Sequence, residues 1–145
     1  MNAGKNALSA VRRPTVPVLK TLRVMVVEDD EADAFLIATA LKGDPHVYSV
    51  DQAADGVAAM QMIAGGAASP DAVIVDLHMP RMDGFKLLLE LGFRADPRPF
   101  LIVLTSSTAP LDLQRSKLRG ADLVLTKPAS LGELKNMLQE ALDRI

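Results

Sequence analysis

The sequence predicts an α/β domain built on a doubly wound sheet of five parallel strands in the order 2-1-3-4-5. Short apolar blocks have the length and β-branched character of strands buried on both faces. Helical patterns separate them, and this alternation builds a parallel sheet with helices on both faces. A chain of 145 residues is long enough for one such domain. The blocks are LRVMVV (22–27), HVYSV (46–50), DAVIV (71–75), PFLIVL (99–104) and ADLVL (121–125).

Most of the predicted helices have a recognisable end. The first should end near Lys42-Gly43 and the second at Gly65-Gly66, because glycine accommodates a helix C-terminus. Asp83-Gly84 supplies an N-cap for the third, and Ser130 with Glu133 forms a capping box for the fifth. The expected apolar faces are Phe35, Leu36, Ala40 and Leu41; Val57, Met60, Ile63 and Ala64; Phe85, Leu88, Leu89 and Leu91; Leu111, Leu113 and Leu118; and Leu131, Leu134, Leu138, Leu142 and Ile145.

The composition excludes several kinds of site. The chain has no cysteine, which excludes disulfides, thiolate metal sites and thiol nucleophiles, and its two histidines argue against a zinc centre. No apolar run reaches the roughly 18 residues of a membrane helix, and the N-terminus lacks the apolar core of a secretion signal. We therefore expect a cytoplasmic protein without a membrane-bound part.

Charge and composition divide the chain into two parts. Residues 1–21 contain prolines and small polar residues without a sustained period, so we expect a flexible extension there and the domain at residues 22–145. Four of the 16 basic residues and none of the 18 acidic ones lie within residues 1–20, so the remainder carries 12 basic and 18 acidic residues. An acidic domain argues against nucleic acid as its direct ligand.

Polar side chains end four of the five predicted strands. Asp76 follows the third strand, and Pro80 then stops the chain from continuing as strand or helix. The acidic run 28–30 follows the first strand, Thr105 the fourth and Lys127 the fifth. In the flavodoxin-like strand order the first and third strands are neighbours at the switch point where such sheets bind ligands. The sequence therefore predicts one polar pocket at this edge.

Crowded carboxylates at such an edge need an opposing charge. Two unit charges about 4 Å apart repel by about 4 kcal/mol at an effective dielectric near 20. Lys127 offsets part of this, and Mg²⁺ prefers a pocket of oxygen ligands. A carboxylate beside Mg²⁺, with an amine and a hydroxyl placed to bind phosphoryl oxygens, can attack phosphorus and become an acyl phosphate. Taken singly, the acidic run also fits a helix cap, Thr105 and Asp76 fit turns, and Lys127 fits a solvated surface residue.

Jointly these residues resemble the receiver domains of two-component response regulators, which have the CheY-like fold, from Arg23 to about Leu142. The resemblance implies that Asp76 accepts a phosphoryl group from a histidine kinase. Thr105 would contact that group and relay its arrival, and Lys127 would pair with it. The matching motifs are VVEDD (26–30), VDLHMPRMDG (75–84), LTSS (104–107) and LTKP (125–128).

The resemblance also implies the ligands of a magnesium ion. Asp29 would bind Mg²⁺ directly together with Asp76, Glu28 would bind through water, and the backbone carbonyl of His78 would be the third protein ligand. Asp30 and Ser107 are expected just outside these ligands, in contact with them and not with the ion. Ser107 and the His78 side chain occupy the two variable positions that flank the attacking water in receivers. The His78 imidazole either influences hydrolysis or is an exposed loop residue, and the sequence favours neither. His46 is expected at the surface or core edge.

Further features concern signalling. The LTSS segment, the DLQRS that follows and the absence of an attached output domain resemble regulators that partner phytochrome-type histidine kinases. This implies a homodimer through the fourth helix, fifth strand and fifth helix. Val124 stands where many receivers have a switching aromatic ring, so we expect the signal to pass through Thr105 and the segment after it. The resemblance implies a cis bond between Lys127 and Pro128, against a prior of about 5% for X-Pro bonds.

Two other functions are compatible with a carboxylate at this edge. An Asp-nucleophile, Mg-dependent phosphotransferase or phosphatase would need a second acid two residues after Asp76, where His78 stands, and a substrate-covering insertion. A flavodoxin-like FMN carrier would need aromatic rings and a site that accepts a phosphate dianion. We expect a signalling phosphoacceptor, which is not an enzyme in the ordinary sense because it has no separate substrate.

Overall fold

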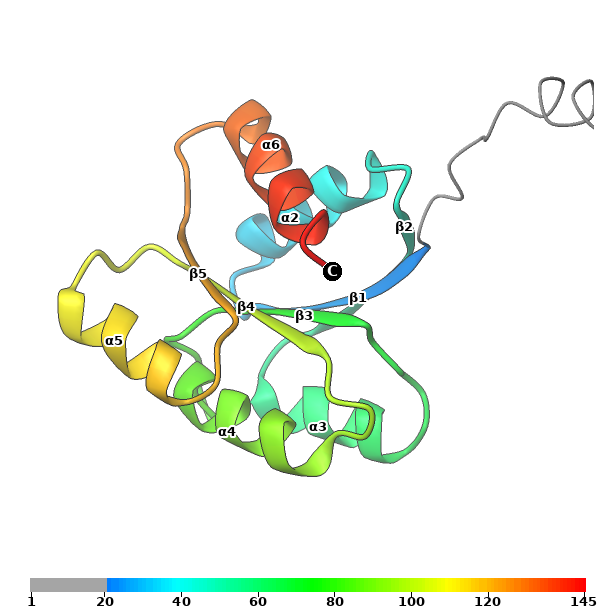
Figure 1. The fold of residues 1–145 in the computed structure, drawn as a ribbon, viewed down its shortest axis with the longest axis vertical. Coiled ribbons are helices and arrows are strands. Elements are labelled where there is room, and N and C mark those ends of the chain that lie inside the picture. The colour runs from blue at the N-terminus through cyan, green and yellow to red at the C-terminus, as the bar shows by residue number, and fades with distance from the viewer. Residues whose placement is uncertain (1–20) are drawn as a thin grey trace, which may run out of the picture.

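The structure is a computed structural model that describes residues 21–145, and a parallel sheet lies between two layers of helices (Figure 1). All but the last residue of the predicted N-terminal extension lies outside the described part. No helix in residues 21–145 is long and apolar enough to cross a membrane. The strands are β1 (Leu22–Val27), β2 (Val47–Ala53), β3 (Ala72–Val75), β4 (Phe100–Thr105) and β5 (Leu123–Thr126). The helices are α2 (Glu31–Lys42), α3 (Gly56–Ala64), α4 (Gly84–Arg94), α5 (Pro110–Leu118) and α6 (Leu131–Leu142).

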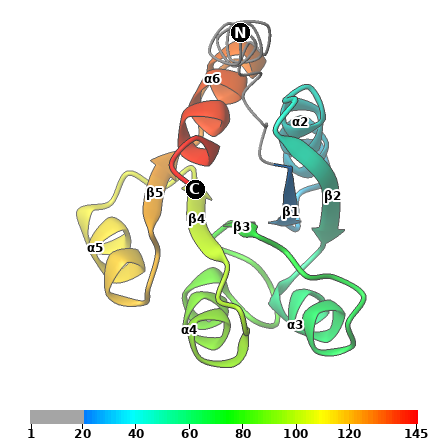
Figure 2. The same cartoon turned by 45° about the vertical axis from the view of Figure 1, so that its right-hand side comes forward.

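The sheet has the predicted strand order. Its strands run β2-β1-β3-β4-β5, and every pairing is parallel. Helices α2 and α6 cover one face, and α3, α4 and α5 cover the other (Figures 1 and 2). In this order β1 and β3 pair directly, with Val27 opposite Val75, so the residues that follow these two strands emerge side by side.

Alternating side chains of the central strands fill two hydrophobic cores, one on each face of the sheet. Successive residues of a strand point to opposite faces, and covering both faces with helices makes both sets apolar. The core beneath α2 and α6 contains Val24, Val26, Ala72, Ile74, Ile102 and Leu104. The core beneath α3 and α4 contains Met25, Val27, Val73, Val75, Leu101 and Val103.

Helix ends confirm most of the predicted caps. The side chains of Asp83 and Ser130 accept hydrogen bonds from the backbone N–H groups three residues on, as expected. The predicted C-terminal glycines, Gly43 and Gly65, cap α2 and α3. Such caps fix where each helix starts relative to the strand before it, and therefore where the loops at the carboxyl edge run.

Each of the five predicted apolar faces contains at least one exposed residue, which on α3, α4 and α6 is Ala64, Leu89 and Leu131. On α5, Leu111 and Leu118 are 77% and 82% exposed, whereas Ser116 is fully buried. The Ser116 hydroxyl donates to the backbone oxygen of Asp112, so burial leaves it satisfied. On α2, Phe35 is also exposed, and the smaller Ala40 with Leu41 packs on the sheet. Apolar periodicity mispredicted the buried face of α5, because the fully buried residue of this helix is a serine and not a leucine.

The predicted cis bond before Pro128 is a further correction. In the part of the chain that the structure describes, the cis peptide bond joins Asp96 to Pro97, and the bond between Lys127 and Pro128 is not cis. The trans form is the ordinary state because it is favoured by about 0.5–1 kcal/mol at X-Pro bonds.

The start of α4 lies against the end of β3 with no room for a side chain. A Cβ atom on Gly84 would lie 2.2 Å from the backbone oxygen of Asp76 and 2.7 Å from the Cα of Leu77. The Gly84 N–H also donates to the backbone oxygen of Leu77 at 2.9 Å. This close approach closes the loop that follows Asp76.

We expect Gly84→Ala to lower the free energy of unfolding by about 1–3 kcal/mol, because the added methyl group must displace backbone. Gly92→Ala is the matched control on the same helix, where an added Cβ meets nothing within 4 Å. That change should raise stability by up to about 1 kcal/mol through helix propensity. Urea unfolding measures both, and equal effects of the two substitutions would contradict the close approach.

Candidate functional site

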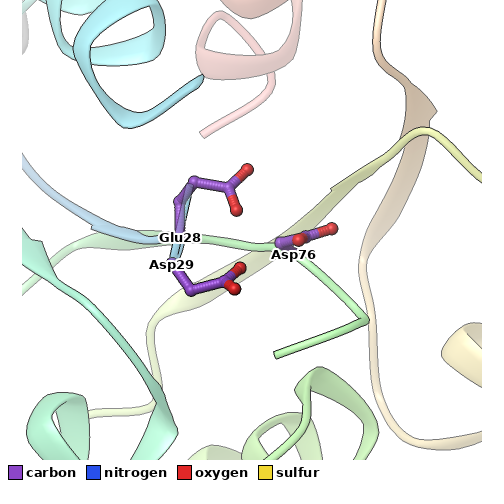
Figure 3. A group of neighbouring side chains, drawn as sticks. All are labelled: Glu28, Asp29 and Asp76. Atoms are coloured by element: carbon purple, nitrogen blue, oxygen red, sulfur yellow. The ribbon is translucent and has the colours of Figure 1, made fainter. Parts of the chain in front are cut away.

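Three carboxylates meet at the carboxyl edge of the sheet. Glu28 and Asp29 follow β1, Asp76 follows β3, and each offers an oxygen within 4.8 Å of the others (Figure 3). Glu28 is 5% exposed, and the Asp76 side chain is 12% exposed. The structure brings these three side chains together, and their role as one site stays a prediction. Their neighbouring positions follow from the direct pairing of β1 with β3.

Asp30 performs a structural task beside this cluster. Its side chain accepts a hydrogen bond from the backbone N–H of Asp33 at 2.8 Å and so caps α2. Its own backbone N–H points to Glu28 Oε2 at 3.4 Å. The alternative assignment of the acidic run to a helix cap therefore holds for Asp30, and the other two acids remain available to a ligand.

Lys127 follows the edge strand β5 and brings a positive charge to the carboxylates. Its Nζ lies 2.5 Å from Glu28 Oε1, 2.8 Å from Asp33 Oδ2 and 3.9 Å from Asp76 Oδ1. The backbone N–H of Lys127 donates to the backbone oxygen of Thr105 at 2.8 Å, which fixes the segment after β5. The structure places Lys127 beside the acidic cluster, with Asp33 as an additional partner.

Burial and ion pairing shift the pKa values of Glu28 and Lys127 in opposite directions. Burial raises the pKa of Glu28 to about 7, the hydrogen bond from Lys127 opposes this rise, and the nearby Asp76 charge adds to it. Burial alone would lower the pKa of Lys127, but hydrogen bonds to Asp33 and Glu28 outweigh it, so the lysine pKa is raised. The ammonium is therefore stably charged, while the crowded Glu28 carboxyl resists ionisation.

Thr105 connects the end of β4 to the start of α5. Its side chain is fully buried, and its Oγ1 accepts a hydrogen bond from the backbone N–H of Ser107 at 3.1 Å. The Ser107 hydroxyl donates to Asp112 Oδ2 at 2.7 Å, in the first turn of α5. His78 Nε2 lies 3.4 Å from the same oxygen. Ser107 therefore faces α5, and the exposed His78 ring approaches the same Asp112 carboxylate from the loop after β3.

The Asp112 carboxylate is the centre of this second network. The hydrogen bond from Ser107 lowers the pKa of Asp112, partial desolvation opposes that effect, and His78 lowers it further. The His78 side chain is 62% exposed. The structure thus places His78 as an exposed loop residue with one acidic neighbour, and its influence on hydrolysis stays a prediction.

A second ion pair holds the loop between β3 and α4. Arg81, a non-glycine residue at φ 63°, donates to Asp55 Oδ2 from both Nε and Nη2. Met82 lies against Gly56, where an added Cβ would be 2.9 Å from the methionine side chain. The loop that carries the predicted metal ligand His78 is therefore fixed to the start of α3.

Sequence reasoning missed Asp33, Asp55, Arg81 and Asp112. Asp55 carried a usable signal, because Asp55-Gly56 after β2 repeats the Asp83-Gly84 pattern that predicted the α4 cap. The others carried none, since their roles depend on contacts between segments distant in sequence. His46, by contrast, is partly exposed at the core edge, as expected, although it lies just before β2, with its Nδ1 2.9 Å from Asp44 Oδ1.

The donor set fits a hard divalent cation. Three carboxylates offer oxygen atoms within 4.8 Å of one another. Burial and the charge of Asp76 raise the pKa of one of them, Glu28. Carboxylate oxygens with an exposed rim are the environment that Mg²⁺ prefers, because it retains several waters. Glu28, Asp29 and Asp76 can therefore hold such an ion.

Comparison with known proteins identifies relatives. A family model described as the response regulator receiver domain matches residues 24–139. The chain is 37% identical to response regulator MprA of Mycobacterium sp. (strain KMS) over 123 residues, covering 85% of this chain and 51% of MprA. The chain thus spans about half the length of the curated relatives it matches.

Two solved structures are similar over most of their length. The phosphorylated cyanobacterial phytochrome response regulator RcpA superposes with a TM-score of 0.77 at 27% identity, covering 85% of this chain and 92% of RcpA. The Mn²⁺-bound response regulator Rcp1 gives a TM-score of 0.72 at 28% identity, covering 82% of this chain and 90% of Rcp1.

We expect Asp55→Ala to lower the free energy of unfolding by about 1–2 kcal/mol, because it removes the α3 cap and the partner of Arg81. Asp55→Asn should cost less, since its amide oxygen can still cap the helix. The hydrogen bond from Ala58 N–H is the main cause that lowers the Asp55 pKa, ahead of the opposing desolvation.

A lowered carboxyl pKa fixes the sign of the pH dependence. The stabilisation from the Asp55 charge is present above its unfolded pKa, near 4, and is lost as the pH falls through the lower folded value. The stability difference between wild type and Asp55→Asn should therefore shrink below about pH 4. Urea unfolding across this range measures it, and a difference independent of pH would contradict the assignment.

Proposed function

Because the chain belongs to the response regulator receiver family, we propose that it is a phosphorylation-operated signalling module whose acceptor is Asp76. The observation that carries the proposal is the meeting of Glu28, Asp29 and Asp76 with the Lys127 ammonium at one edge of the sheet. The donor is the phosphohistidine of a sensor histidine kinase. The result is a changed surface on the receiver domain and no separate substrate turnover.

The transfer forms one bond and breaks one. A carboxylate oxygen of Asp76 attacks phosphorus, and the P–N bond to the kinase imidazole breaks as the P–O bond forms. The bond electrons leave with the imidazole nitrogen, and the other ring nitrogen keeps its proton, so a neutral histidine departs. Asp76 is left as an acyl phosphate. Asp76 lies at the strand end with its side chain 12% exposed.

Side chains around Asp76 have separate tasks in this step. Lys127 donates a hydrogen bond to a phosphoryl oxygen, and the Thr105 hydroxyl donates to another. Glu28, Asp29, Asp76 and the backbone carbonyl of His78 would hold Mg²⁺. When bound, this ion neutralises negative charge that would otherwise repel the incoming phosphoryl group.

The surface change is proposed to travel from Thr105 to α5. The hydrogen bonds Ser107 N–H to Thr105 Oγ1 and Ser107 Oγ–H to Asp112 Oδ2 support this route, because they join the end of β4 to the first turn of α5. Val124 on β5 provides no aromatic ring to move. The exposed Leu111 and Leu118 on α5 support the predicted homodimer through α5, β5 and α6.

The partner is proposed to be a phytochrome-type histidine kinase. The similarity to RcpA and Rcp1 supports this, since RcpA is a phytochrome response regulator. The phosphotransferase alternative is less favoured. Its general acid would stand at His78, whose side chain is 62% exposed and lies next to the Asp112 carboxylate.

Intact-mass measurement after incubation with acetyl phosphate and Mg²⁺ tests the proposal. We expect one adduct of about 80 Da per chain, the mass of a phosphoryl group. Asp76→Asn should abolish it, and Asp51→Asn on β2 should retain it as the matched control. Steady release of phosphate without an adduct would instead support the phosphatase, and an adduct that persists in Asp76→Asn would place the acceptor elsewhere.

A further inference from the structure

Lys127 has one more carboxylate partner than the proposed phosphoryl transfer requires. Its Nζ is within hydrogen-bond distance of Glu28 and Asp33, at 2.5 and 2.8 Å, while Asp76 Oδ1 is 3.9 Å away. An ammonium group has three N–H donors. Two of them are directed to Glu28 and Asp33, so the third N–H can point toward Asp76. A separation of 3.9 Å is too long for a direct hydrogen bond, and it leaves space for an oxygen carried by Asp76.

Asp33 is held firmly in place by α2. Its backbone N–H donates to Asp30 Oδ1 at 2.8 Å, and Ala34 N–H donates to the Asp30 backbone oxygen at 2.9 Å. Asp33 therefore lies in a capped first turn, and only its side chain is free to adjust. Because the turn is fixed relative to β1, the Asp33 backbone keeps its carboxylate within reach of the long and otherwise flexible lysine side chain.

The surroundings of the pair shield the lysine from water more than the aspartate. The Lys127 side chain is 17% exposed and that of Asp33 is 40% exposed. They border a small hollow of about 50 Å³ between α2 and α6. Partial exclusion of water strengthens an ion pair relative to one on an open surface. The apolar residues lining the hollow are Leu36, Ile37, Leu104, Pro128 and Leu134.

Glu28 and Asp33 differ in their other duties. Glu28 belongs to the group of carboxylates that can hold a cation, and Asp33 is not a member of that group. A Glu28 carboxylate drawn toward a cation is a weaker partner for the lysine. Asp33 then remains as the carboxylate that keeps the ammonium at the pocket.

We propose that Asp33 is a positioning residue that holds the Lys127 ammonium against the acidic cluster, so that its third N–H is directed to a phosphoryl group on Asp76. Asp33 acts through the lysine and does not touch the phosphoryl group or the cation. This inference rests on the proposed function, because it assigns a role in that same transfer.

The test compares Asp33→Ala with Glu31→Ala, which removes an acidic residue from the same helix turn. The rate of phosphorylation by acetyl phosphate at saturating Mg²⁺ should fall about threefold to tenfold in Asp33→Ala, the range expected for one partly shielded charged hydrogen bond. Glu31→Ala should remain within twofold of wild type. Asp33→Glu, which restores a carboxylate on a longer side chain, should recover part of the rate.

Two readouts do not depend on phosphorylation. The side-chain amine resonance of Lys127, assigned with Lys127→Arg and recorded without divalent cation, should be protected from exchange in wild type and Glu31→Ala and be lost in Asp33→Ala. The affinity for Mn²⁺, measured by electron paramagnetic resonance, should be unchanged in Asp33→Ala because the residue is not a ligand.

The outcomes separate the two proposals. A wild type that never acquires a phosphoryl group overturns the proposed function, and this inference with it. A phosphorylated wild type with Asp33→Ala reacting as fast as Glu31→Ala, or faster than wild type, overturns only the role of Asp33. An unchanged Lys127 resonance in Asp33→Ala, or a loss of Mn²⁺ affinity, also overturns it.

Discussion

Electrostatic crowding at the ends of β1 and β3 is the constraint on which this structure depends. Three carboxylates offer oxygens within 4.8 Å of one another, and at such distances each pair of charges repels by a few kcal/mol at an effective dielectric near 20. Within residues 21–145, the counter-charge that pairs with these carboxylates is Lys127, from the end of β5. That single ammonium cannot balance all three acids. Burial is the main cause of the raised pKa of Glu28, and the neighbouring Asp76 charge adds to it.

The scaffold around the cluster explains how such a site persists. Gly84 allows α4 to start against the backbone of Asp76, and the Arg81–Asp55 pair fixes the intervening loop to α3. Asp30 caps α2 and thereby places Asp33 beside Lys127. Each of these contacts joins a loop at the carboxyl edge to a neighbouring helix. Helix termini and backbone contacts therefore hold the polar groups, while the two apolar cores hold the sheet.

Sequence alone was sufficient for the architecture because its signals are local or periodic. The strand blocks and the glycine and aspartate caps follow from short-range physics, and the polar residues at strand ends needed only the rule that parallel strands share an edge. Glu28, Asp29, Asp76 and Lys127 were predicted in this way. The second partner of Lys127 was not, because Asp33 looks like any acidic residue in a first helical turn.

Other failures have a similar physical origin. Apolar periodicity predicted that α5 would bury leucines, but the helix buries Ser116, whose hydroxyl is satisfied within its own helix. The cis bond predicted before Pro128 was carried over from a family resemblance, and no feature of the segment itself requires it. Contacts such as Arg81 with Asp55 join residues 26 apart in sequence, and no local pattern specifies them.

Thermal or urea unfolding of wild type and Asp29→Asn, with and without Mg²⁺, tests the central claim of unbalanced charge most directly. Without divalent cation, Asp29→Asn should be more stable than wild type, because one repelling charge is removed. Added Mg²⁺ should stabilise wild type, by about 2.7 kcal/mol at a hundredfold excess over its Kd, and have little effect on Asp29→Asn. A wild type whose stability is independent of Mg²⁺, with Asp29→Asn less stable in its absence, would contradict the account.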